Sequence, residues 1–300
     1  MELKQSKWLT YVLLTLTVLF WSGNFILGRG IREMIPPVSL NFWRWVGALL
    51  ILIPFGLPRI ARQRDLFLRH WKMVLLLSIP SITFFNAFIY NALQTTTATN
   101  TVLVNATVPV LIALIARFVL KDRLSRRQVA GVAISLLGLV LIVTRGDLMM
   151  LAKLTLSTGD LWTLGAALSW AVYSVMLRKR PPQMDPIAFL TLLVIFGLIF
   201  SLPWYAWEFA RMGGFALSTV AAASLVYVAL FPSVLSFIFW NNGIQKVGAN
   251  RTGIFIHLMP VFSIIMAVLF LGERLRLFHL AGMTLIFTGI ALTTLPARKP

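Results

Sequence analysis

An internal repeat constrains the fold of this chain more than any other feature of its sequence. Residues 94–141 align without gaps on residues 245–292, at a shift of 151 positions. Prolines and glycines keep the same places in both copies, so coincidence is a poor explanation. The residues that recur identically are Gln94, Ala98, Thr101, Pro109, Val110, Ala116, Leu120, Arg123, Leu124, Ala130, Gly131, Gly138 and Leu141. The chain is therefore a duplication.

The composition indicates an integral membrane protein. Apolar residues make up 59% of the 300 residues and charged residues only 12%, whereas a soluble domain of this size needs more charge on its surface. The chain contains no cysteine, so disulfides, thiolate metal sites and cysteine nucleophiles are excluded. The basic residues, which give a net charge of +18, lie between hydrophobic segments. That placement favours contacts with membrane lipids and argues against nucleic acid as a partner.

Ten apolar segments are long enough to cross a membrane, because about 20 residues at 1.5 Å each span a hydrocarbon core of ~30 Å. In chain order, the predicted spans 1 to 10 cover residues 8–28, 38–58, 71–93, 97–119, 127–144, 160–178, 186–207, 218–243, 252–271 and 277–295. The loops between them are short and leave no room for a soluble domain. The expected fold is all-α integral membrane, with ten transmembrane helices.

The Lys and Arg residues are distributed unevenly between the two sets of loops. With the N-terminus in the cytoplasm, 19 of the 27 basic residues fall in cytoplasmic segments, 7 fall outside, and Arg44 lies within a span. Cytoplasmic loops of membrane proteins are enriched in basic residues. We therefore expect a multi-pass protein of the bacterial inner membrane, with both termini in the cytoplasm.

The duplication and the ten spans together predict two inverted five-helix repeats, residues 1–146 and 147–300. Five is an odd number, so the second copy crosses the membrane in the opposite direction. Trp21 and Arg29 of span 1 match Trp170 and Arg178 of span 6 at a shift of 149, which supports this pairing. Inverted repeats with polar residues at mid-depth are typical of carriers that open alternately to the two sides.

Several short motifs make the chain resemble the EamA-type branch of the drug/metabolite transporter superfamily over essentially its whole length. The motifs are Trp21-Ser22-Gly23-Asn24-Phe25, Arg44, Pro109 followed by Asp122-Arg123-Leu124, and Pro260 followed by Glu273-Arg274-Leu275. The resemblance implies a basket of ten helices in which spans 3, 4, 8 and 9 are central, spans 1, 2, 6 and 7 are gates, and spans 5 and 10 are peripheral. Within this branch, the aromatic content is most similar to that of YddG-type aromatic amino-acid exporters, which implies export.

Polar and aromatic side chains within the spans are candidate substrate contacts, because such groups usually face the bundle interior or a wet cavity. We select Asn24, Arg44, Asn86, Tyr90, Asn105, Trp170, Tyr173, Ser236, Trp240 and His257. The same spans also contain Asn91, Ser233, Asn241 and Asn242. For the Asn and Ser residues an interhelical hydrogen bond is an equally good explanation, and for the Trp residues core packing is one. We expect the selected residues to line one central cavity shared by both repeats.

For two of the candidates, Arg44 and His257, the sequence allows several different explanations. Arg44 lies about 9 Å from the outer end of span 2 by helical rise, so its side chain can snorkel to the headgroups or face a substrate. His257 is the only titratable residue deep in the second half. It can donate to a substrate carboxylate, carry a proton, or pack as a satisfied core residue.

Prolines and glycines mark where the spans are expected to bend or to pack closely. Spans 4, 8 and 9 contain Pro109, Pro232 and Pro260, respectively. Proline removes a helical hydrogen bond, so we expect bends that free backbone carbonyls. Gly131 and Gly138, repeated as Gly282 and Gly289, lie seven residues apart on one helix face and predict close helix packing.

The sequence lacks the residues that membrane-embedded catalysis requires. All nine acidic residues lie at span ends or in loops, the three histidines are scattered, and no glycine-rich phosphate loop is present. We therefore expect neither an enzyme nor a cofactor or metal site. Exchange of a cation for a proton is also disfavoured, because no carboxylate lies inside a span.

The expected function is export of a small-molecule substrate, an aromatic or neutral amino acid, by alternating access through the central cavity. A lining of aromatic and amide side chains without a fixed carboxylate favours neutral or zwitterionic solutes. Efflux of drugs or lipophilic cations is the alternative, because cations bind to the faces of aromatic rings. A membrane-embedded enzyme is a weaker alternative. The oligomeric state stays open, and a monomer is among the options.

Overall fold

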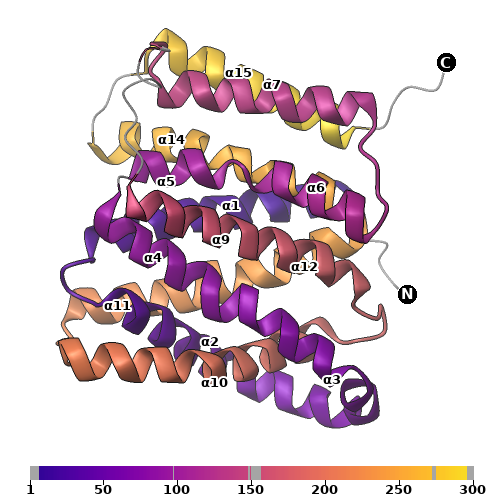
Figure 1. Ribbon diagram of the computed structural model, residues 1–300, viewed down its shortest axis with the longest axis vertical. Helices are drawn as coiled ribbons and strands as arrows, with labels where there is room; N and C mark the ends of the chain where they lie inside the picture. Colours follow the sequence, from indigo (N-terminus) through magenta and orange to yellow (C-terminus); the bar gives the residue numbers. More distant parts are fainter. Residues whose placement is uncertain (1–6, 97, 148, 150–156, 272–274, 296–300) are drawn as a thin grey trace.

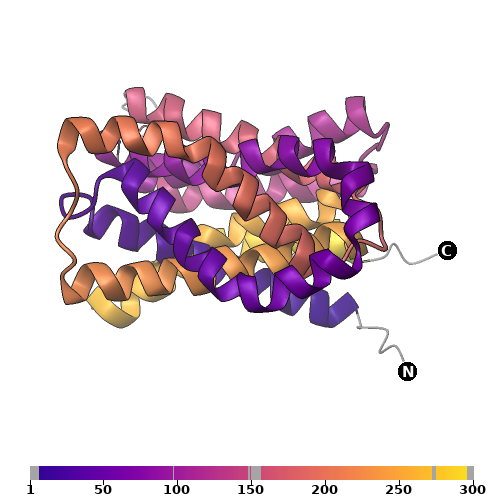
Figure 2. The same cartoon turned by 90° about the horizontal axis from the view of Figure 1, so that it is seen from below.

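Helices form the regular structure of the described chain and make ten membrane-length spans. The computed structural model describes residues 7–96, 98–147, 149, 157–271 and 275–295. Within these ranges, ten helical stretches are long and apolar enough to cross a membrane, by length and composition. The long helices run along one common direction in both views (Figures 1 and 2). The prediction of an all-α protein with ten transmembrane helices is confirmed.

Several spans are built from more than one helical segment. The first half contains α1 (Lys7–Gly30), α2 (Pro37–Arg62), α3 (Arg64–Ser78), η1 (Ile79–Phe84), α4 (Phe85–Thr95), α5 (Ala98–Asn105), α6 (Val108–Val119) and α7 (Arg126–Val143). The second half contains α9 (Thr158–Met176), η2 (Leu177–Lys179), α10 (Pro186–Met212), α11 (Thr219–Val228), η3 (Ala229–Leu235), α12 (Ser236–Val247), α13 (Ala249–Gly253), η4 (Ile254–Leu258), α14 (Met259–Leu271) and α15 (Leu277–Thr294). Span 3 comprises α3, η1 and α4; span 4, α5 and α6; span 6, α9 and η2; span 8, α11, η3 and α12; and span 9, α13, η4 and α14.

Span 3 begins earlier than the hydropathy pattern predicts. We expected it to start at residue 71, but α3 starts at Arg64. The extra turns contain Asp65 and Arg69. Charged residues lower the mean hydropathy, so these turns were not counted as part of an apolar segment. Their leucines and arginines nevertheless favour a helix, and Phe67 is buried against the bundle. The other predicted ends differ from the observed ends by at most five residues.

Helices α7 and α15 pack against each other at one edge of the bundle, at the top of Figure 1. A side-chain carbon added at Gly138 would lie 2.6 Å from the Gly282 carbonyl oxygen, and one added at Gly282 would lie 2.7 Å from the Gly138 carbonyl oxygen. Only glycine therefore allows the two backbones to approach so closely. The predicted close packing is confirmed, and spans 5 and 10 lie at the edge of the bundle.

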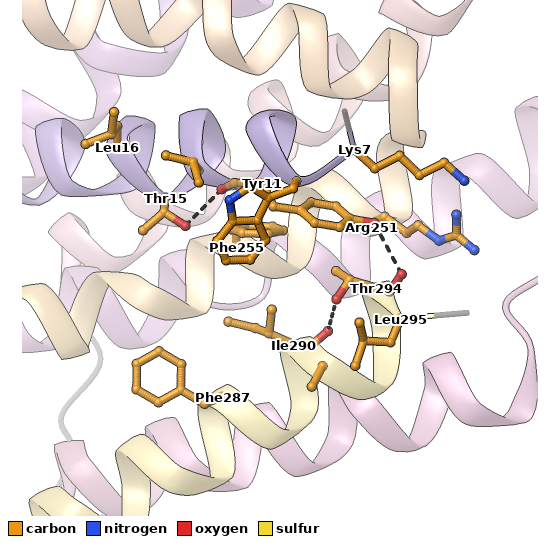
Figure 3. Close-up of a pocket in the computed structure, with 13 residues that line it drawn as sticks. Lys7, Tyr11, Thr15, Leu16, Arg251, Phe255, Phe287, Ile290, Thr294 and Leu295 are labelled. Atoms are coloured by element: carbon orange, nitrogen blue, oxygen red, sulfur yellow. Dashed lines mark hydrogen bonds between the residues drawn. The ribbon is translucent and has the colours of Figure 1, made fainter. Parts of the chain in front are cut away.

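A groove lies between α1 and α15, with Arg251 of α13 and Phe255 of η4 also in its lining (Figure 3). Its volume is about 700 Å³. The Tyr11 ring on α1 stacks on Phe255 of η4, with centroids 5.7 Å apart. The Tyr11 hydroxyl donates a hydrogen bond to the Thr294 carbonyl of α15 across 3.2 Å. These contacts connect spans 1, 9 and 10 along the groove.

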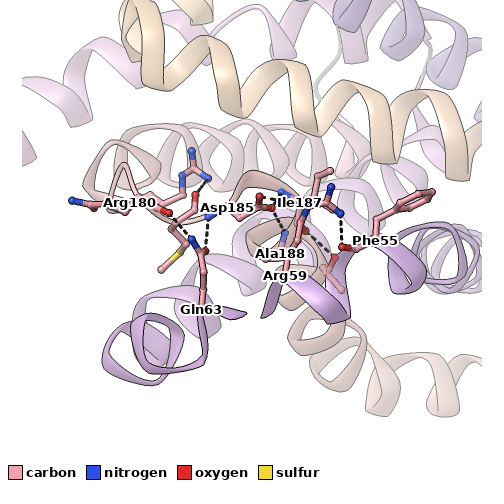
Figure 4. A network of polar contacts seen from close by, with 10 residues as sticks. Phe55, Arg59, Gln63, Arg180, Asp185, Ile187 and Ala188 are labelled. Atoms are coloured by element: carbon pink, nitrogen blue, oxygen red, sulfur yellow. Dashed lines mark hydrogen bonds and ion pairs between the residues drawn. The ribbon is translucent and has the colours of Figure 1, made fainter. Parts of the chain in front are cut away.

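Helices α2 and α10 lie at the opposite edge and are joined by polar contacts where α10 begins (Figure 4). Asp185 Oδ1 accepts hydrogen bonds from Ile187 N and Ala188 N across 2.9 and 3.0 Å, which caps α10. Asp185 N donates to Gln63 Oε1 across 2.8 Å, at the end of α2. Arg59 Nε of α2 lies 3.6 Å from Asp185 Oδ2. The end of α2 thus holds the start of α10.

The other ends of the same two helices are joined by Glu208. Its carboxylate accepts hydrogen bonds from Val38 N at 2.9 Å, Ser39 N at 2.6 Å and Ser39 Oγ at 2.7 Å. Those amides belong to the first turn of α2, where a negative charge is stabilising. Glu208 comes from the last turns of α10 and is buried. Glu208 of α10 thus caps the start of α2, while Gln63 and Arg59 at the end of α2 hold Asp185, which caps the start of α10.

Arg29 and Arg178 make matching contacts in the two halves. Arg29 Nη1 donates to the Leu93 carbonyl at the end of α4. Arg178 Nη1 donates to the Ile244 carbonyl near the end of α12, across 3.2 Å. Ile244 follows Leu93 by the 151 positions of the repeat, and Arg178 follows Arg29 by 149. An arginine thus occupies equivalent helix ends in the two halves, where a cation is stabilising.

The three prolines selected from the sequence, Pro109, Pro232 and Pro260, coincide with interruptions of regular helix, as predicted, whereas Pro54, Pro58 and Pro203 lie inside uninterrupted α-helices. Span 4 breaks between α5 and α6, with Pro109 as the second residue of α6. Span 9 passes through the 3₁₀ segment η4 before Pro260, the second residue of α14. Pro232 lies inside the π-helical segment η3, and Pro80 lies in the π-helical η1 of span 3. π-Helical turns alter the backbone hydrogen-bond pattern and are frequent at functional sites.

Candidate functional site

The ten residues selected from the sequence are all buried in this conformation. Their exposed fractions do not exceed 3%. The structure brings most of them into two adjoining clusters, one polar and one aromatic, and leaves Asn105, Ser236 and His257 apart from both. In this conformation their side chains contact one another and their neighbours.

Arg44 is the centre of the polar cluster. Its Nη1 donates to Asn86 Oδ1 across 2.8 Å and to the Tyr90 hydroxyl across 2.7 Å, both from α4. The same nitrogen lies 3.4 Å from Asn24 Oδ1 of α1. Arg44 Nε donates to Ser233 Oγ of η3 across 2.8 Å. One guanidinium therefore connects spans 1, 2, 3 and 8.

The snorkelling explanation for Arg44 is wrong. Its side chain is 1% exposed and turns into the bundle, because four polar side chains from other spans receive it there. The ion pairs between described residues, Arg32–Glu33 and Arg59–Asp185, do not include Arg44. The described partners of Arg44 are neutral oxygens, so the cluster carries a net positive charge. An uncompensated buried charge is costly, and an anionic ligand would relieve that cost.

Four tryptophans, Trp21, Trp45, Trp170 and Trp240, form the aromatic cluster together with Phe237. Trp21 of α1 lies with its centroid 5.0 Å from those of Trp170 and Trp240. Trp170 of α9 and Trp240 of α12 are 5.5 Å apart, and Phe237 lies 5.2 Å from Trp170. Such spacings are those of favourable aromatic pairs. Rings from both halves of the chain therefore meet in one place.

Trp45 joins the aromatic cluster to the polar one. The Arg44 guanidinium carbon lies 5.2 Å from the centroid of the Trp45 ring. The Trp45 ring in turn lies 5.0 Å from Phe237, edge to face. The cation and the aromatic rings thus form one continuous buried region.

The polar atoms of the aromatic cluster are only partly satisfied. Trp240 Nε1 donates to Ser174 Oγ across 3.1 Å, and the Tyr173 hydroxyl donates to Asn241 Oδ1 across 2.7 Å. In contrast, the indole N–H groups of Trp45 and Trp170 are buried and have no hydrogen-bond partner in the described part of the chain. Buried donors without acceptors are rare in native structures. The Trp45 ring lies directly beside the Arg44 guanidinium, and Trp170 is connected to Trp45 through Phe237.

The π-helical segment η3 explains part of this arrangement. The Pro232 carbonyl accepts a hydrogen bond from Trp21 Nε1 across 3.2 Å, as expected for a carbonyl near an interrupted helix. Ser233 Oγ donates to the Val228 carbonyl across 2.7 Å and accepts from Arg44. Ser236 Oγ donates to the Phe231 carbonyl across 2.9 Å and joins neither cluster. The serine that meets Arg44 is therefore Ser233, three residues before the one selected.

His257 is held by two protein partners from the first half of the chain. Its Nε2 lies 3.0 Å from the Ala106 carbonyl and its Nδ1 lies 2.6 Å from Ser135 Oγ. A carbonyl only accepts, so Nε2 carries a proton, and Nδ1 of the neutral ring accepts from the serine hydroxyl. Both nitrogens are thus engaged, as in the packing explanation. A substrate or proton role for His257 stays a prediction.

Asn105 and His257 lie at the matching interruptions of spans 4 and 9. Asn105 Nδ2 lies 3.4 Å from Met259 Sδ, while Asn105 Oδ1 is buried without a hydrogen-bond partner in the described ranges. Spans 4 and 9 therefore contact each other at their breaks. These residues are separate from the Arg44 cluster.

The sequence analysis missed Trp45 and Ser174 and assigned Trp21 no part in the site. Tryptophan in a span is as typical of packing as of binding, so its type alone carries no signal. The position of Trp45 directly after the in-span Arg44 was the one available clue. Ser174 lies in α9, directly after Tyr173. Only its hydrogen bond with Trp240 Nε1 marks it as part of the site, and that contact is not visible in the sequence.

Comparisons with known proteins identify the family. The profile of the EamA-like transporter family matches residues 8–144 and again residues 157–295. The chain belongs to the EamA-like transporter family. The predicted membership of the drug/metabolite transporter superfamily is confirmed, and this EamA-like transporter is a multi-pass membrane transport protein. The second acidic-Arg-Leu turn used for that prediction lies partly at residues 272–274, outside the described residues.

Individual proteins similar to this EamA-like transporter are also transporters. An "uncharacterized transporter" of Archaeoglobus fulgidus is 30% identical over 95% of this chain and 97% of its own length. A "probable terminal-alkyne amino-acid exporter" of Streptantibioticus cattleyicolor is 26% identical over 97% of this chain and 94% of its own. A solved crystal structure aligns with a TM-score of 0.76 at 20% identity, over 95% of this chain and 96% of its own, which shows a shared fold. The family and the names of these relatives indicate transport rather than catalysis.

Proposed function

We propose that the protein exports neutral amino acids with large apolar or aromatic side chains. One observation carries the proposal: the Arg44 guanidinium has no carboxylate partner among the described residues and adjoins a buried aromatic cluster with two unpartnered indole N–H groups. A carboxylate is the group that such donors are suited to receive, because guanidinium and carboxylate form paired, charge-assisted hydrogen bonds. Substrate-binding roles for the ten selected residues belong to the same proposal.

The remaining parts of an amino acid have matching surroundings. The side-chain oxygens of Asn24 and Asn86 and the Tyr90 hydroxyl are hydrogen-bond acceptors suited to an ammonium group. The rings of Trp21, Trp170 and Trp240 offer apolar area for the substrate side chain. The relative named as an amino-acid exporter supports this substrate class.

Transport would proceed by alternating access in a bacterial inner membrane, with both termini in the cytoplasm. The support is the predicted inverted repeat, residues 1–146 and 147–300, together with the matching contacts of Arg29 and Arg178. Carriers with inverted repeats expose a central site to one side and then to the other. The conformation described is closed around the clusters, so substrate binding would require helices from the two halves to separate. The residues act here by binding and orienting the substrate.

Efflux of lipophilic cations is the second candidate. The aromatic rings favour it, because cations bind to ring faces. The Arg44 charge opposes it, since a cation that brings no carboxylate of its own would be repelled in the same buried region. We therefore place amino acids first.

Counterflow of radiolabelled tryptophan into proteoliposomes tests the proposal, with tryptophan and tryptophanamide as competitors. The amide lacks the carboxylate but keeps the ring and the amine, and we expect it to compete at least about tenfold less well. Arg44→Gln is expected to lose this discrimination, whereas Arg32→Gln, which changes a partly exposed arginine in an ion pair with Glu33, keeps it. Equal competition by acid and amide in the wild type would overturn the carboxylate site. Competition only by aromatic cations would favour the second candidate.

A further inference from the structure

The groove between α1 and α15 is charged at one end only. Lys7 and Arg251 lie together at this end, and Leu16 and Phe287 lie towards the other (Figure 3). From Lys7 to Leu16 the wall of α1 extends about 14 Å along the helix axis, at 1.5 Å per residue. No acidic residue lines the groove, and neither cation forms an ion pair with a described carboxylate.

The wall of the groove beyond the two cations is apolar in character. The hydroxyl of Thr15 donates to the Tyr11 carbonyl across 2.9 Å, and that of Thr294 donates to the Ile290 carbonyl across 2.7 Å. Their polar atoms are thus used within their own helices. Large apolar side chains complete the wall, and among them Phe287 is 54% exposed. A groove of this kind is suited to a hydrocarbon chain rather than to a polar solute.

The positions of the two cations match the edge of a membrane. Lys7 is the first residue of α1, Arg251 is the third residue of α13, and α15 ends at Thr294 beside them. All three spans therefore have an end at this level, where phospholipid headgroups lie. The remainder of the groove extends from there towards the hydrocarbon core, because α1 and α15 are membrane spans.

We propose that this groove binds one anionic phospholipid. An acyl chain lies between α1 and α15, and the headgroup phosphate contacts Lys7 and Arg251. Two cations without an opposing carboxylate select an anionic headgroup over a zwitterionic one, because each basic side chain near the surface attracts anionic lipid. The site differs in residues from the Arg44 region, and the inference does not depend on which solute the protein carries.

Native mass spectrometry of the purified protein tests this proposal, with phosphatidylglycerol and phosphatidylcholine of equal chain length as probes. We expect the wild type to retain one phosphatidylglycerol more tightly than phosphatidylcholine. The double variant Lys7→Gln/Arg251→Gln should bind phosphatidylglycerol about thirtyfold more weakly, roughly fivefold for each cation. Arg64→Gln/Arg69→Gln removes the same charge from exposed positions of α3 and is expected to leave binding unchanged.

A second variant tests the groove itself. Ala291→Trp places a large side chain in the groove lining and should reduce binding of both lipids, with the charges intact. Unchanged retention of phosphatidylglycerol in the Lys7/Arg251 variant would overturn the proposal, and so would an equal loss in the α3 variant. If Ala291→Trp changes the oligomeric mass and not the lipid count, the groove is an interface between copies, and the lipid assignment is wrong. Thermal unfolding of each variant identifies loss of folding, in which case single substitutions at Lys7 and Arg251 replace the double one.

Discussion

The Tyr90 hydroxyl lies 2.7 Å from Arg44 Nη1 and accepts its hydrogen bond. The same hydroxyl donates to Asn24 Oδ1 across 2.6 Å. Tyr90 therefore orients the guanidinium and links it to span 1. The Tyr90 hydroxyl accepts from the buried Arg44 and donates to the Asn24 amide oxygen at the same time. No apolar side chain can replace it in both roles.

Tyr90→Phe is expected to destabilise the protein by about 1–3 kcal/mol, because Arg44 loses one acceptor and Asn24 one donor in a buried place. Thermal unfolding in detergent measures this change. Tyr205→Phe is the matched control, since Tyr205 pairs with Trp43 at an exposed position. Equal melting temperatures for both variants would show that the bond contributes nothing measurable.

Glu208→Gln is expected to lower the thermal stability, by about 1–2 kcal/mol. The carboxylate receives three hydrogen bonds at the start of α2, and an amide both weakens them and removes the charge that the helix terminus favours. Glu33→Gln changes an exposed acidic residue and serves as the control. A Glu208→Gln protein as stable as the wild type would contradict a capping role.

Trp240→Ala is expected to cost about 3–5 kcal/mol of stability in addition to transport, because the side chain is buried against Trp21 and Trp170 and its removal leaves a void. This differs from the sequence-based view of Trp240 as a cavity wall, which predicts an intact fold. Parallel measurement of counterflow and unfolding separates the two. Trp240→Phe should recover most of the stability, and a fully stable alanine variant would restore the cavity-wall interpretation.

His257→Ala is expected to destabilise the contact between spans 4, 5 and 9 without changing the pH dependence of transport. Both ring nitrogens are engaged by Ala106 and Ser135, so we assign the ring no proton transfer. Counterflow measured between about pH 6 and 8 provides the test. Loss of a pH response in the variant, where the wild type shows one, would assign proton coupling to His257.

The orientation in the membrane is tested with single cysteines, because the chain contains none of its own. Ser125→Cys lies before α7 and Ala216→Cys lies between α10 and α11, both at exposed positions. Only Ala216→Cys should react with an impermeant maleimide in intact cells, as the distribution of basic residues predicts. Reaction of Ser125→Cys alone would reverse the assigned topology.

The spans could be predicted from sequence because hydropathy is a local property. Even so, the start of span 3 was missed. A charged helical turn such as that around Asp65 has a low hydropathy, and hydropathy alone does not distinguish it from a loop. The inversion of the repeats follows from counting spans and stays a prediction. Family membership was accessible for a similar reason, through short motifs that keep their order along the chain.

The contacts of Arg44 could not be predicted in the same way. Its partners Asn86 and Ser233 lie 42 and 189 positions away, and nothing local distinguishes an arginine that turns inward from one that snorkels. The choice between Ser233 and Ser236 depends on the π-helical turn η3, which changes the side-chain directions that a regular helix would give. Most of the selected residues lie close together in the structure. The residue types alone, however, did not show which side chains contact each other.

The mutual capping of α2 and α10 has a mechanical consequence. Separating these helices at the start of α2 would leave the amides of Val38 and Ser39 without acceptors and the buried Glu208 carboxylate without donors. Separating them at the start of α10 would remove the Gln63 acceptor of Asp185 N and the ion pair of Asp185 with Arg59. Any rearrangement of the bundle that keeps these bonds must therefore move the two helices as a single rigid strut. We then expect bending where the helical pattern is already interrupted, at η1, η3 and the breaks of spans 4 and 9.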